Sequence, residues 1–389
     1  MYAAVRDHAY RDDREQPFHK NKKSTLMKPL GLGVLGLGEG RSIISAGVRS
    51  ALWDVVCLCD TNARLAQERC AEFGVEQYTT DYEAMLADPA IDAIGIYTPD
   101  HLHADHILAA LAAGKHVICT KPFIDDLSRA RELLDAQVSS GKAVMVGQST
   151  RFFEPFMRQR EHYESGALGD LVTVEASYSA DHRWFLDKPW ARQAAFKWLY
   201  GGISHPADLV RWYLPNVSEV MGYAYLSANG REGGLVNPDT YHFVLKASDG
   251  RIARVTGVYS CPTVPVERDS PMTCILRCDL GASQADYHEL HYAWTVGKQA
   301  AIESFESKRD YYFRFGGNSH HAGEYQNYIE YFARSLAAGE TPRPDVREGI
   351  VTVALMQAMD EAAQTEQPVR IADLLGRYGL EGLLAETAR

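Results

Sequence analysis

The 389-residue sequence contains no run of about 18 apolar residues, so no segment has the length and polarity of a transmembrane helix. It also lacks an excess of positive charge: 40 lysines and arginines stand against 51 aspartates and glutamates, a net charge of −11. Such a surface repels the phosphates of nucleic acids. Neither a membrane nor a nucleic acid is therefore expected as a partner.

Cysteines are few, and their spacing indicates neither a disulfide framework nor a metal site. There are seven, an odd number, and several lie inside apolar runs, as Cys57 and Cys59 do. Such positions are typical of reduced core residues in a cytoplasmic protein. Cys274 and Cys278 have no second pair at zinc spacing, and the alternation around them predicts a strand. No metal site is predicted.

The chain is too long for one ordinary hydrophobic core, so two domains are expected. Residues 1–26 have no sustained apolar period and predict a flexible N-terminal extension, without the long apolar segment of a secretory signal or membrane anchor. Residues 27–150 are expected to form a dinucleotide-binding domain. Residues 151–389 are expected to form a substrate-binding and oligomerisation domain.

The stretch from residue 30 to residue 60 predicts a nucleotide-binding unit. An apolar strand, Leu30–Leu35, runs into a glycine-rich turn, a helix and a second strand that ends at Asp60. Glycines at such a turn let a pyrophosphate approach backbone N–H groups at a helix start. The third fingerprint position is Arg41, so the pattern G-x-G-x-x-G is incomplete and by itself also fits an ordinary strand-to-helix turn.

A carboxylate at the end of the second strand indicates which cofactor to expect. Asp60 would accept hydrogen bonds from the ribose hydroxyls and repel a 2′-phosphate, which favours NAD over NADP. The residues of this unit that are expected to contact the cofactor are Gly36, Gly38, Glu39, Gly40, Arg41, Asp60 and Arg64.

The segments that follow alternate between strand and helix. Three further strands are expected at 91–97, 115–119 and 143–147, with helices at 63–73, 81–86, 104–113 and 128–140. This alternation predicts an α/β fold with a doubly wound, parallel Rossmann sheet. In such sheets the ligand lies beyond the carboxyl ends of the strands.

From about residue 151 the pattern changes to repeated strands. Five or six strand signals occur, at 171–178, 218–226, 240–247, 251–259, 273–280 and 285–294. They predict an α+β domain with one large, open, mostly antiparallel sheet, which amphipathic helices at 320–338 and 346–364 would complete. An open sheet commonly buries its bare face against another subunit, so a homodimer or homotetramer is expected.

Four motifs taken together resemble one family. They are Gly36-Leu37-Gly38 with Asp60, Thr98-Pro99-Asp100-His101-Leu102-His103, Thr120-Lys121-Pro122 and His205-Pro206-Ala207-Asp208. Over residues 28–375 the chain resembles the glucose–fructose oxidoreductase/inositol dehydrogenase (Gfo/Idh/MocA) family. The resemblance implies a Rossmann domain, a C-terminal domain with an open sheet, and NAD(P)-dependent oxidation or reduction of sugars and cyclitols. It adds Thr98, Pro99, His103 and Lys121 to the expected cofactor contacts.

The resemblance also implies that Lys121 and His205 are catalytic. Lys121 matches the lysine of the family's Glu-Lys-Pro motif, and a desolvated ammonium can hydrogen-bond a developing alkoxide. His205 matches the family histidine that takes the hydroxyl proton, a task that suits imidazole. Two family carboxylates are missing: Thr120 replaces the glutamate, and Gly201 replaces an aspartate four residues before the histidine.

Substrate contacts are expected around His205. Without the family aspartate, Asp181, His182 or Asp208 would have to orient or replace that histidine. The tryptophans nearby either stack on a sugar ring or form an interdomain core, and both alternatives stay open. The expected substrate-binding residues are Lys121, Asp181, His182, Trp184, Trp190, His205 and His320.

The predicted function is NAD-dependent hydride transfer between nicotinamide and a secondary alcohol of a sugar, sugar derivative or cyclitol. One alternative is an enzyme that cleaves or eliminates a glycoside through transient oxidation by NAD, which the missing aspartate at Gly201 favours without selecting it. Another alternative is a non-catalytic NAD-binding sensor. The presence of both Lys121 and His205 argues against the sensor.

Overall fold

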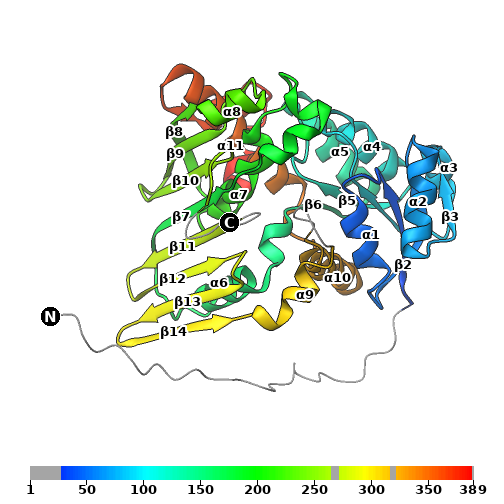
Figure 1. Cartoon of the computed structure of the whole chain (residues 1–389), viewed down its shortest axis with the longest axis horizontal. Coiled ribbons are helices and arrows are strands. Elements are labelled where there is room, and N and C mark those ends of the chain that lie inside the picture. The colour runs from blue at the N-terminus through cyan, green and yellow to red at the C-terminus, as the bar shows by residue number, and fades with distance from the viewer. Residues whose placement is uncertain (1–27, 264–270, 316–320, 388–389) are drawn as a thin grey trace.

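The computed structural model describes residues 28–263, 271–315 and 321–387, and it contains two β-sheets with helices packed on them (Figure 1). The expected extension at residues 1–26 lies outside the described residues. Within the described part of the chain, no helix combines the length and the apolar character that a membrane span needs.

The first sheet is parallel and has the strand order β3-β2-β1-β4-β5-β6, which is the order of a doubly wound dinucleotide-binding fold. Its strands are β1 (Leu30–Leu35), β2 (Trp53–Cys59), β3 (Gln77–Thr79), β4 (Ala93–Ile96), β5 (His116–Thr120) and β6 (Val144–Gly147). The predicted Rossmann sheet is confirmed. Strand β3 was not predicted, because none of its three residues is buried and the apolar signal of a strand is missing.

Local capping signals set the helix boundaries in this part of the chain. The helices are α1 (Arg41–Gly47), α2 (Ala63–Phe73), α3 (Tyr82–Ala87), α4 (His103–Ala112) and α5 (Ala130–Ser140). The Asn62 side chain accepts a hydrogen bond from the Leu65 backbone N–H at the start of α2, and Gly74 ends this helix in the left-handed conformation. The predicted helix at 63–73 is therefore confirmed at both ends.

The second sheet is mixed and mostly antiparallel, with the order β14-β13-β12-β11-β7-β10-β9-β8-β15. Its strands are β7 (Leu171–Ser179), β8 (Val217–Tyr225), β9 (Thr240–Ala247), β10 (Ile252–Val258), β11 (Met272–Cys278), β12 (Gly281–Asp286), β13 (His291–Val296), β14 (Gln299–Ser304) and β15 (Val369–Arg370). Strands β7 and β10 pair in parallel. The expected large, mostly antiparallel sheet is confirmed.

The predicted single strand at 285–294 is wrong. The chain turns between β12 and β13, where Leu290 has a positive φ of 52°, and the two strands pair as an antiparallel hairpin. No glycine, proline or asparagine marks this turn, and its one turn residue is Asp286, whose side chain accepts from the Glu289 backbone N–H at 2.8 Å. A single aspartate is a weak turn signal. Strands β14 and β15 were also not predicted.

Helices cover one face of the second sheet. The helices of this part are α6 (Glu154–Glu164), α7 (Ser204–Tyr213), α8 (Ala228–Gly233), α9 (Arg309–Tyr312), α10 (Gly323–Ala338), α11 (Val346–Thr365), α12 (Ile371–Gly376) and α13 (Leu383–Thr387). Helices α6, α7 and α11 pack on β12, β7 and β8, respectively. The opposite face carries exposed side chains, including Tyr223 and Val244.

Helix α10 lies beside α1 of the first part of the chain (Figure 1). The Trp53 Nε1–H donates to the Ile329 carbonyl oxygen at 2.8 Å, and the Trp53 ring stacks on Phe332 with the ring centroids 6.2 Å apart. The sequence pattern had assigned this helix to the second domain. Its apolar face instead covers the Rossmann part, because an amphipathic pattern specifies a buried face but not the partner.

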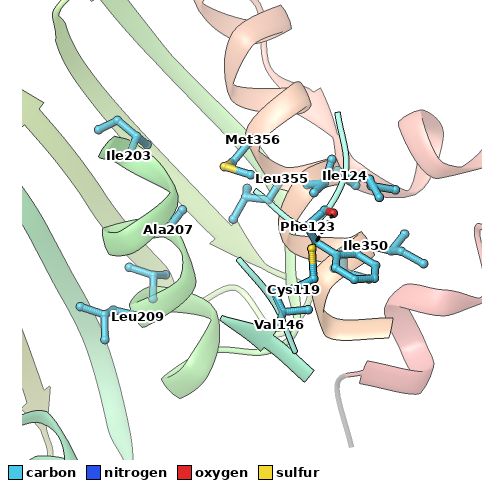
Figure 2. Close-up of a cluster of buried hydrophobic side chains, with 14 of the residues drawn as sticks. Cys119, Phe123, Ile124, Val146, Ile203, Ala207, Leu209, Ile350, Leu355 and Met356 are labelled. Atoms are coloured by element: carbon cyan, nitrogen blue, oxygen red, sulfur yellow. Dashed lines mark hydrogen bonds between the residues drawn. The ribbon is translucent and has the colours of Figure 1, made fainter. Parts of the chain in front are cut away.

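Helix α11 packs against both parts of the chain. Figure 2 shows Ile350, Leu355 and Met356 of this helix in one cluster with Cys119 of β5 and Val146 of β6. A β-carbon on Gly349 would lie only 2.6 Å from the Val146 side chain, so the helix approaches the first sheet closely. This shared core fixes the carboxyl ends of β5 and β6 relative to α7, which also contributes to the cluster.

Candidate active site

The glycine-rich turn after β1 packs tightly on one side and is open in its middle. Gly36 has a φ of 86°, and a β-carbon there would lie 2.6 Å from the Tyr97 carbonyl carbon. A β-carbon on Gly40 would lie 2.3 Å from the Gly36 carbonyl oxygen. Nothing lies within 4 Å of the β-carbon position of Gly38. The turn therefore has the open backbone surface that a pyrophosphate requires.

Asp60 lies beside this turn at the end of β2. Its Oδ2 accepts from the Leu37 backbone N–H at 2.9 Å, and its Oδ1 accepts from the Asn62 backbone N–H at 2.9 Å. Each carboxylate oxygen keeps a second lone pair that a ribose hydroxyl can use. Arg64, another expected cofactor contact, is 88% exposed and forms an ion pair with Glu68 at 2.9 Å.

The two charged residues of the turn have protein partners. Glu39 accepts a hydrogen bond from Lys188 Nζ at 2.9 Å, which connects the turn to the Trp-rich segment of the second part. Arg41 Nε donates to Glu72 Oε1 at 2.6 Å. Both side chains were expected to contact the cofactor, and both are already held next to its expected position.

His103 connects the segments that follow β4 and β5. It is fully buried, with Nδ1 2.9 Å from the Pro122 carbonyl oxygen and Nε2 2.8 Å from the Thr98 carbonyl oxygen. Pro99 precedes a short 3-10 turn, Asp100–Leu102. Since both ring nitrogens are occupied by backbone, His103 supports the expected cofactor site from inside the protein.

Lys121 bridges the two parts of the chain. Its Nζ donates to the carbonyl oxygen of Gly201, which lies in a π-helix, Leu199–Ile203. In a π-helix the carbonyl of residue i accepts from the N–H of residue i+5, and for Gly201 that residue is Pro206, which has no N–H. The Gly201 carbonyl is therefore available to the lysine, at the very position where the family pattern has an aspartate.

The neutral amine of Lys121 is more favourable in its protein surroundings than it would be in water. Removal from water lowers the pKa of Lys121, and the charges of Asp100 and Glu39 raise it in part. Asp100 was not expected to act on Lys121, although it lies in the motif that begins at Thr98. Both carboxylates act on the lysine although the family glutamate is Thr120 in this chain.

His205 lies near the start of α7 and is buried. Its Nδ1 is 2.8 Å from Thr150 Oγ1, and the Thr150 hydroxyl donates to Met272 Sδ at 3.8 Å. A hydroxyl whose one proton points to sulfur accepts from the Nδ1–H, and this leaves the lone pair on Nε2. Burial lowers the pKa of His205 well below its usual value, and the charges of Lys121 and His321 lower it further. These surroundings favour the neutral form of the His205 imidazole.

The carboxylates expected to orient His205 have other partners. Asp208 forms a buried bidentate ion pair with Arg151, with distances of 2.6 and 2.7 Å. Asp181 accepts from Arg183 Nε at 2.8 Å, and this hydrogen bond lowers the pKa of the Asp181 carboxyl. The contact at His205 Nδ1 comes instead from Thr150, which sequence reasoning missed. Its position just after β6, at the carboxyl edge of the sheet, was the available signal.

The aromatic residues before His205 form a core. Trp198 stacks on Tyr259 with centroids 4.7 Å apart and an interplanar angle of 10°, and His182 stacks on Trp198 at 5.3 Å. All three are buried and belong to the second part of the chain, so they form an aromatic core within that part. Trp184 is half-buried at the edge of this stack, 6.0 Å from the His182 ring. The side chain of Trp190 lies outside the described residues.

His320, an expected substrate contact, also lies outside the described residues, but its neighbour His321 is described. His321 Nδ1 contacts the buried Glu324 carboxylate, and the His321 carbonyl oxygen accepts from Ser42 Oγ of α1 at 3.2 Å. Because the charge of His321 lowers the pKa of His205, the two rings share one electrostatic environment. No pattern in the sequence distinguishes His320 from His321.

Buried polar atoms with no partner also mark this site. Within the described ranges, Gln148 Oε1 and Ser204 Oγ are buried and have no hydrogen-bond partner. Gln148 follows β6 and Ser204 directly precedes His205, so both lie on the elements that carry the site. Together with the open turn at Gly38 and the lone pairs of Asp60, they fit a bound dinucleotide. The same described ranges contain no cluster of His, Cys, Asp or Glu side chains that could hold a metal ion.

Both parts of the chain are similar to known proteins. Residues 30–148 match the model of the Gfo/Idh/MocA oxidoreductase family with an NAD-binding Rossmann fold, and residues 156–281 match the Gfo/Idh/MocA C-terminal domain. Levoglucosan dehydrogenase of Pseudarthrobacter phenanthrenivorans is 29% identical over 208 residues, which are 50% of this chain and 53% of that protein. The chain thus matches about half the length of this relative.

Two longer matches cover nearly the whole of the related protein. D-xylose 1-dehydrogenase (NADP(+)) 2 of Haloferax volcanii is 26% identical over 349 residues, 87% of this chain and 98% of that protein. The crystal structure of an oxidoreductase from Agrobacterium radiobacter in complex with NAD+, L-tartaric acid and magnesium has a TM-score of 0.80 at 19% identity. It covers 90% of this chain and 100% of that chain, and at this identity the likeness shows the fold alone. With both family models matched, the chain belongs to the Gfo/Idh/MocA oxidoreductase family.

Proposed function

We propose that the protein transfers a hydride between NAD and a secondary alcohol of a sugar, sugar derivative or cyclitol. The observation that carries this proposal is the hydrogen bond from Lys121 Nζ to the Gly201 carbonyl, one helical turn before His205. It brings an ammonium and a neutral imidazole together beyond the carboxyl ends of the parallel strands, where such folds bind their ligands. Relatives named as levoglucosan and D-xylose dehydrogenases support the substrate class.

The two side chains divide the proton chemistry of alcohol oxidation. When bound, NAD supplies the hydride acceptor. His205 Nε2 takes the hydroxyl proton, because the ring is neutral and its Nδ1 is held by Thr150. Lys121 donates a hydrogen bond to the same oxygen and stabilises the negative charge that develops on it. The alcohol loses a hydride and a proton in total and becomes a carbonyl compound.

A substrate panel tests this function. The purified protein is incubated with NAD and a set of sugars, sugar acids and cyclitols, while NADH absorbance and product formation are followed. Net NADH production supports the proposal. Product without net NADH would indicate transient oxidation, and cofactor binding without any product would indicate a sensor. In either of these cases the proposed net oxidation is wrong.

We infer a preference for NAD over NADP from Asp60. Its carboxylate lies at the corner where a dinucleotide-binding fold holds the adenosine ribose, and a 2′-phosphate there would meet a negative charge. Asp60→Ala is expected to weaken NAD binding by about 1 to 3 kcal/mol, because the ribose hydroxyls lose their acceptor. Isothermal titration calorimetry with both nucleotides measures this.

Asp54→Ala is the matched control for this experiment. Asp54 is exposed on β2 near the end of the strand opposite to Asp60, so its removal changes the net charge equally without touching the ribose corner. NAD affinity should be unchanged in this variant. Equal or tighter binding of NADP by the wild-type protein contradicts the inferred preference.

We also infer that the bare face of the second sheet forms a contact between identical subunits. One row of side chains crosses this face in continuous register, and most of its members are apolar. From β8 to β14 the row consists of Met221, Val244, Arg254, Glu175, Ile275, Gln284, Ala293 and Ile302. Tyr223 and Tyr225 extend the apolar surface on β8, where they are 54% and 59% exposed. A second copy of the same face would remove this surface from water.

Tyr223→Asp is expected to weaken subunit association by at least about tenfold, because a carboxylate would have to lose its water in the interface. Light scattering coupled to size exclusion measures the mass at several protein concentrations. Val138→Asp is the control, since Val138 is 65% exposed on α5, away from the sheet. The inference fails if the wild-type protein is a monomer, or if both variants have the same effect.

A further inference from the structure

Two arginines lie at the corner where the adenosine ribose is expected, although Asp60 favours NAD. Arg69 Nε donates to the Leu37 carbonyl oxygen at 3.1 Å, while Asp60 accepts from the N–H of the same Leu37. The guanidinium of Arg69 and the Asp60 carboxylate are therefore separated by one residue of the glycine-rich turn. Guanidinium groups at this corner of a Rossmann fold are the usual partners of the 2′-phosphate of NADP.

A single carboxylate engages both arginines. Glu72 Oε1 accepts from Arg41 Nε at 2.6 Å, and Glu72 Oε2 accepts from Arg69 Nη1 at 2.7 Å. Arg41 is further fixed by the ring of Phe315, with Cζ 4.1 Å from the ring centroid. The side chains of Arg41, Arg69 and Glu72 are only 29%, 21% and 26% exposed, so these ion pairs are shielded from water in part.

The charges of this corner balance. Two guanidinium groups stand against the carboxylates of Asp60 and Glu72, and each arginine has Glu72 as its carboxylate partner. A 2′-phosphate would have to break these pairs before it could use either arginine, and it would still meet two negative charges. A ribose with a free 2′-hydroxyl needs only an acceptor, which Asp60 offers.

We propose that Glu72 is a specificity-determining residue that holds Arg41 and Arg69 away from a 2′-phosphate and so supports selectivity for NAD over NADP. This inference rests on the proposed function, since it assumes that the corner binds the adenosine ribose of a nicotinamide dinucleotide. Glu72 acts from the far end of α2, twelve residues along the chain from Asp60, so selectivity depends on two carboxylates instead of one.

Glu72→Gln tests the proposal, because it removes the charge and keeps the size of the side chain. Dissociation constants of the purified protein for NAD and for NADP are measured by calorimetry, without any substrate. The NADP constant is expected to fall by about tenfold while the NAD constant stays within about twofold, since each released guanidinium can form a charge-assisted hydrogen bond to the phosphate. Changing Arg41 and Arg69 to alanine in the Glu72→Gln protein should abolish the gain.

Glu68→Gln is the matched control. Glu68 lies one turn earlier on α2 and pairs with Arg64, which is 88% exposed, so this variant removes the same charge from the same helix outside the corner. The proposal is overturned if Glu72→Gln leaves the ratio of the two constants unchanged, or if Glu68→Gln shifts it equally. If the wild-type protein binds neither nucleotide, the proposed function itself fails, and this result is distinct from an unchanged ratio. Thermal unfolding curves establish that each variant is folded.

Discussion

His205→Ala is expected to lower turnover by roughly 10²- to 10⁴-fold and to leave NAD affinity nearly unchanged. The imidazole is buried, neutral and held at Nδ1 by Thr150, so Nε2 is the atom that can take the hydroxyl proton. The glycine turn and Asp60, which are expected to bind the cofactor, follow β1 and β2, whereas His205 lies near the start of α7. Steady-state kinetics with the best substrate of the panel and calorimetry with NAD separate the two effects.

The Thr150→Val variant tests whether His205 acts as a base or only packs in the core. Valine preserves the shape of the side chain but cannot accept from the Nδ1–H, so the ring loses the partner that leaves its lone pair on Nε2. A smaller decrease in turnover is expected, together with a changed pH profile. If His205→Ala turns over normally, the proton acceptor is another group, and Asp181 or the His321–Glu324 pair becomes the candidate.

The pH profile of oxidation follows from the two depressed pKa values. His205 must be unprotonated to act as a base, and its pKa lies well below the ordinary 6.5, so activity should persist below pH 6.5 before it falls. Lys121 must be protonated to donate its hydrogen bond, and its pKa lies below the ordinary 10.5, so the alkaline decrease should begin below pH 10.5. The logarithm of kcat/KM against pH reports both limits for the free enzyme.

Local signals in the sequence predicted most of the first sheet and the position of Lys121 directly after one of its strands. Strand β1 and helix α2 have the predicted boundaries, because apolar runs, a capping asparagine and a glycine stop lie in the sequence itself. Lys121 was predicted from the tripeptide Thr120-Lys121-Pro122. The carboxyl edge of parallel strands then places it near the glycine turn without further information.

The parts of the site that escaped prediction depend on contacts between distant segments. Thr150 and His205 are 55 positions apart, and Glu72 lies 31 positions from Arg41, so no local period connects them. The Gly201 carbonyl carries no side-chain signal at all. Its role depends on the π-helix, Leu199–Ile203, and on Pro206, which lies five residues later and has no N–H to donate to this carbonyl.

Lys121→Met is expected to lower kcat/KM by roughly 10²- to 10³-fold, because the oxygen that gains negative charge during hydride transfer loses its donor. Methionine fills the same space without a charge. Lys115→Met is the matched control: Lys115 is buried at the amino end of β5 and donates to the Asp88 and Ile91 carbonyl oxygens, both at 2.8 Å. Its loss should reduce thermal stability while kcat/KM is retained.

Gly201→Asp tests whether the lysine acts through its charge. The β-carbon position of Gly201 is 3.6 Å from the nearest atom, a carbon of the Phe196 ring, so the side chain can begin there without a clash. A carboxylate beside Lys121 would raise the pKa of the ammonium, and the alkaline limit of activity should move to higher pH. In Lys121→Met this limit should disappear. An alkaline limit that is the same in the wild-type protein and in both variants would assign it to another group, and Lys121 would then have no charge-dependent role in the reaction.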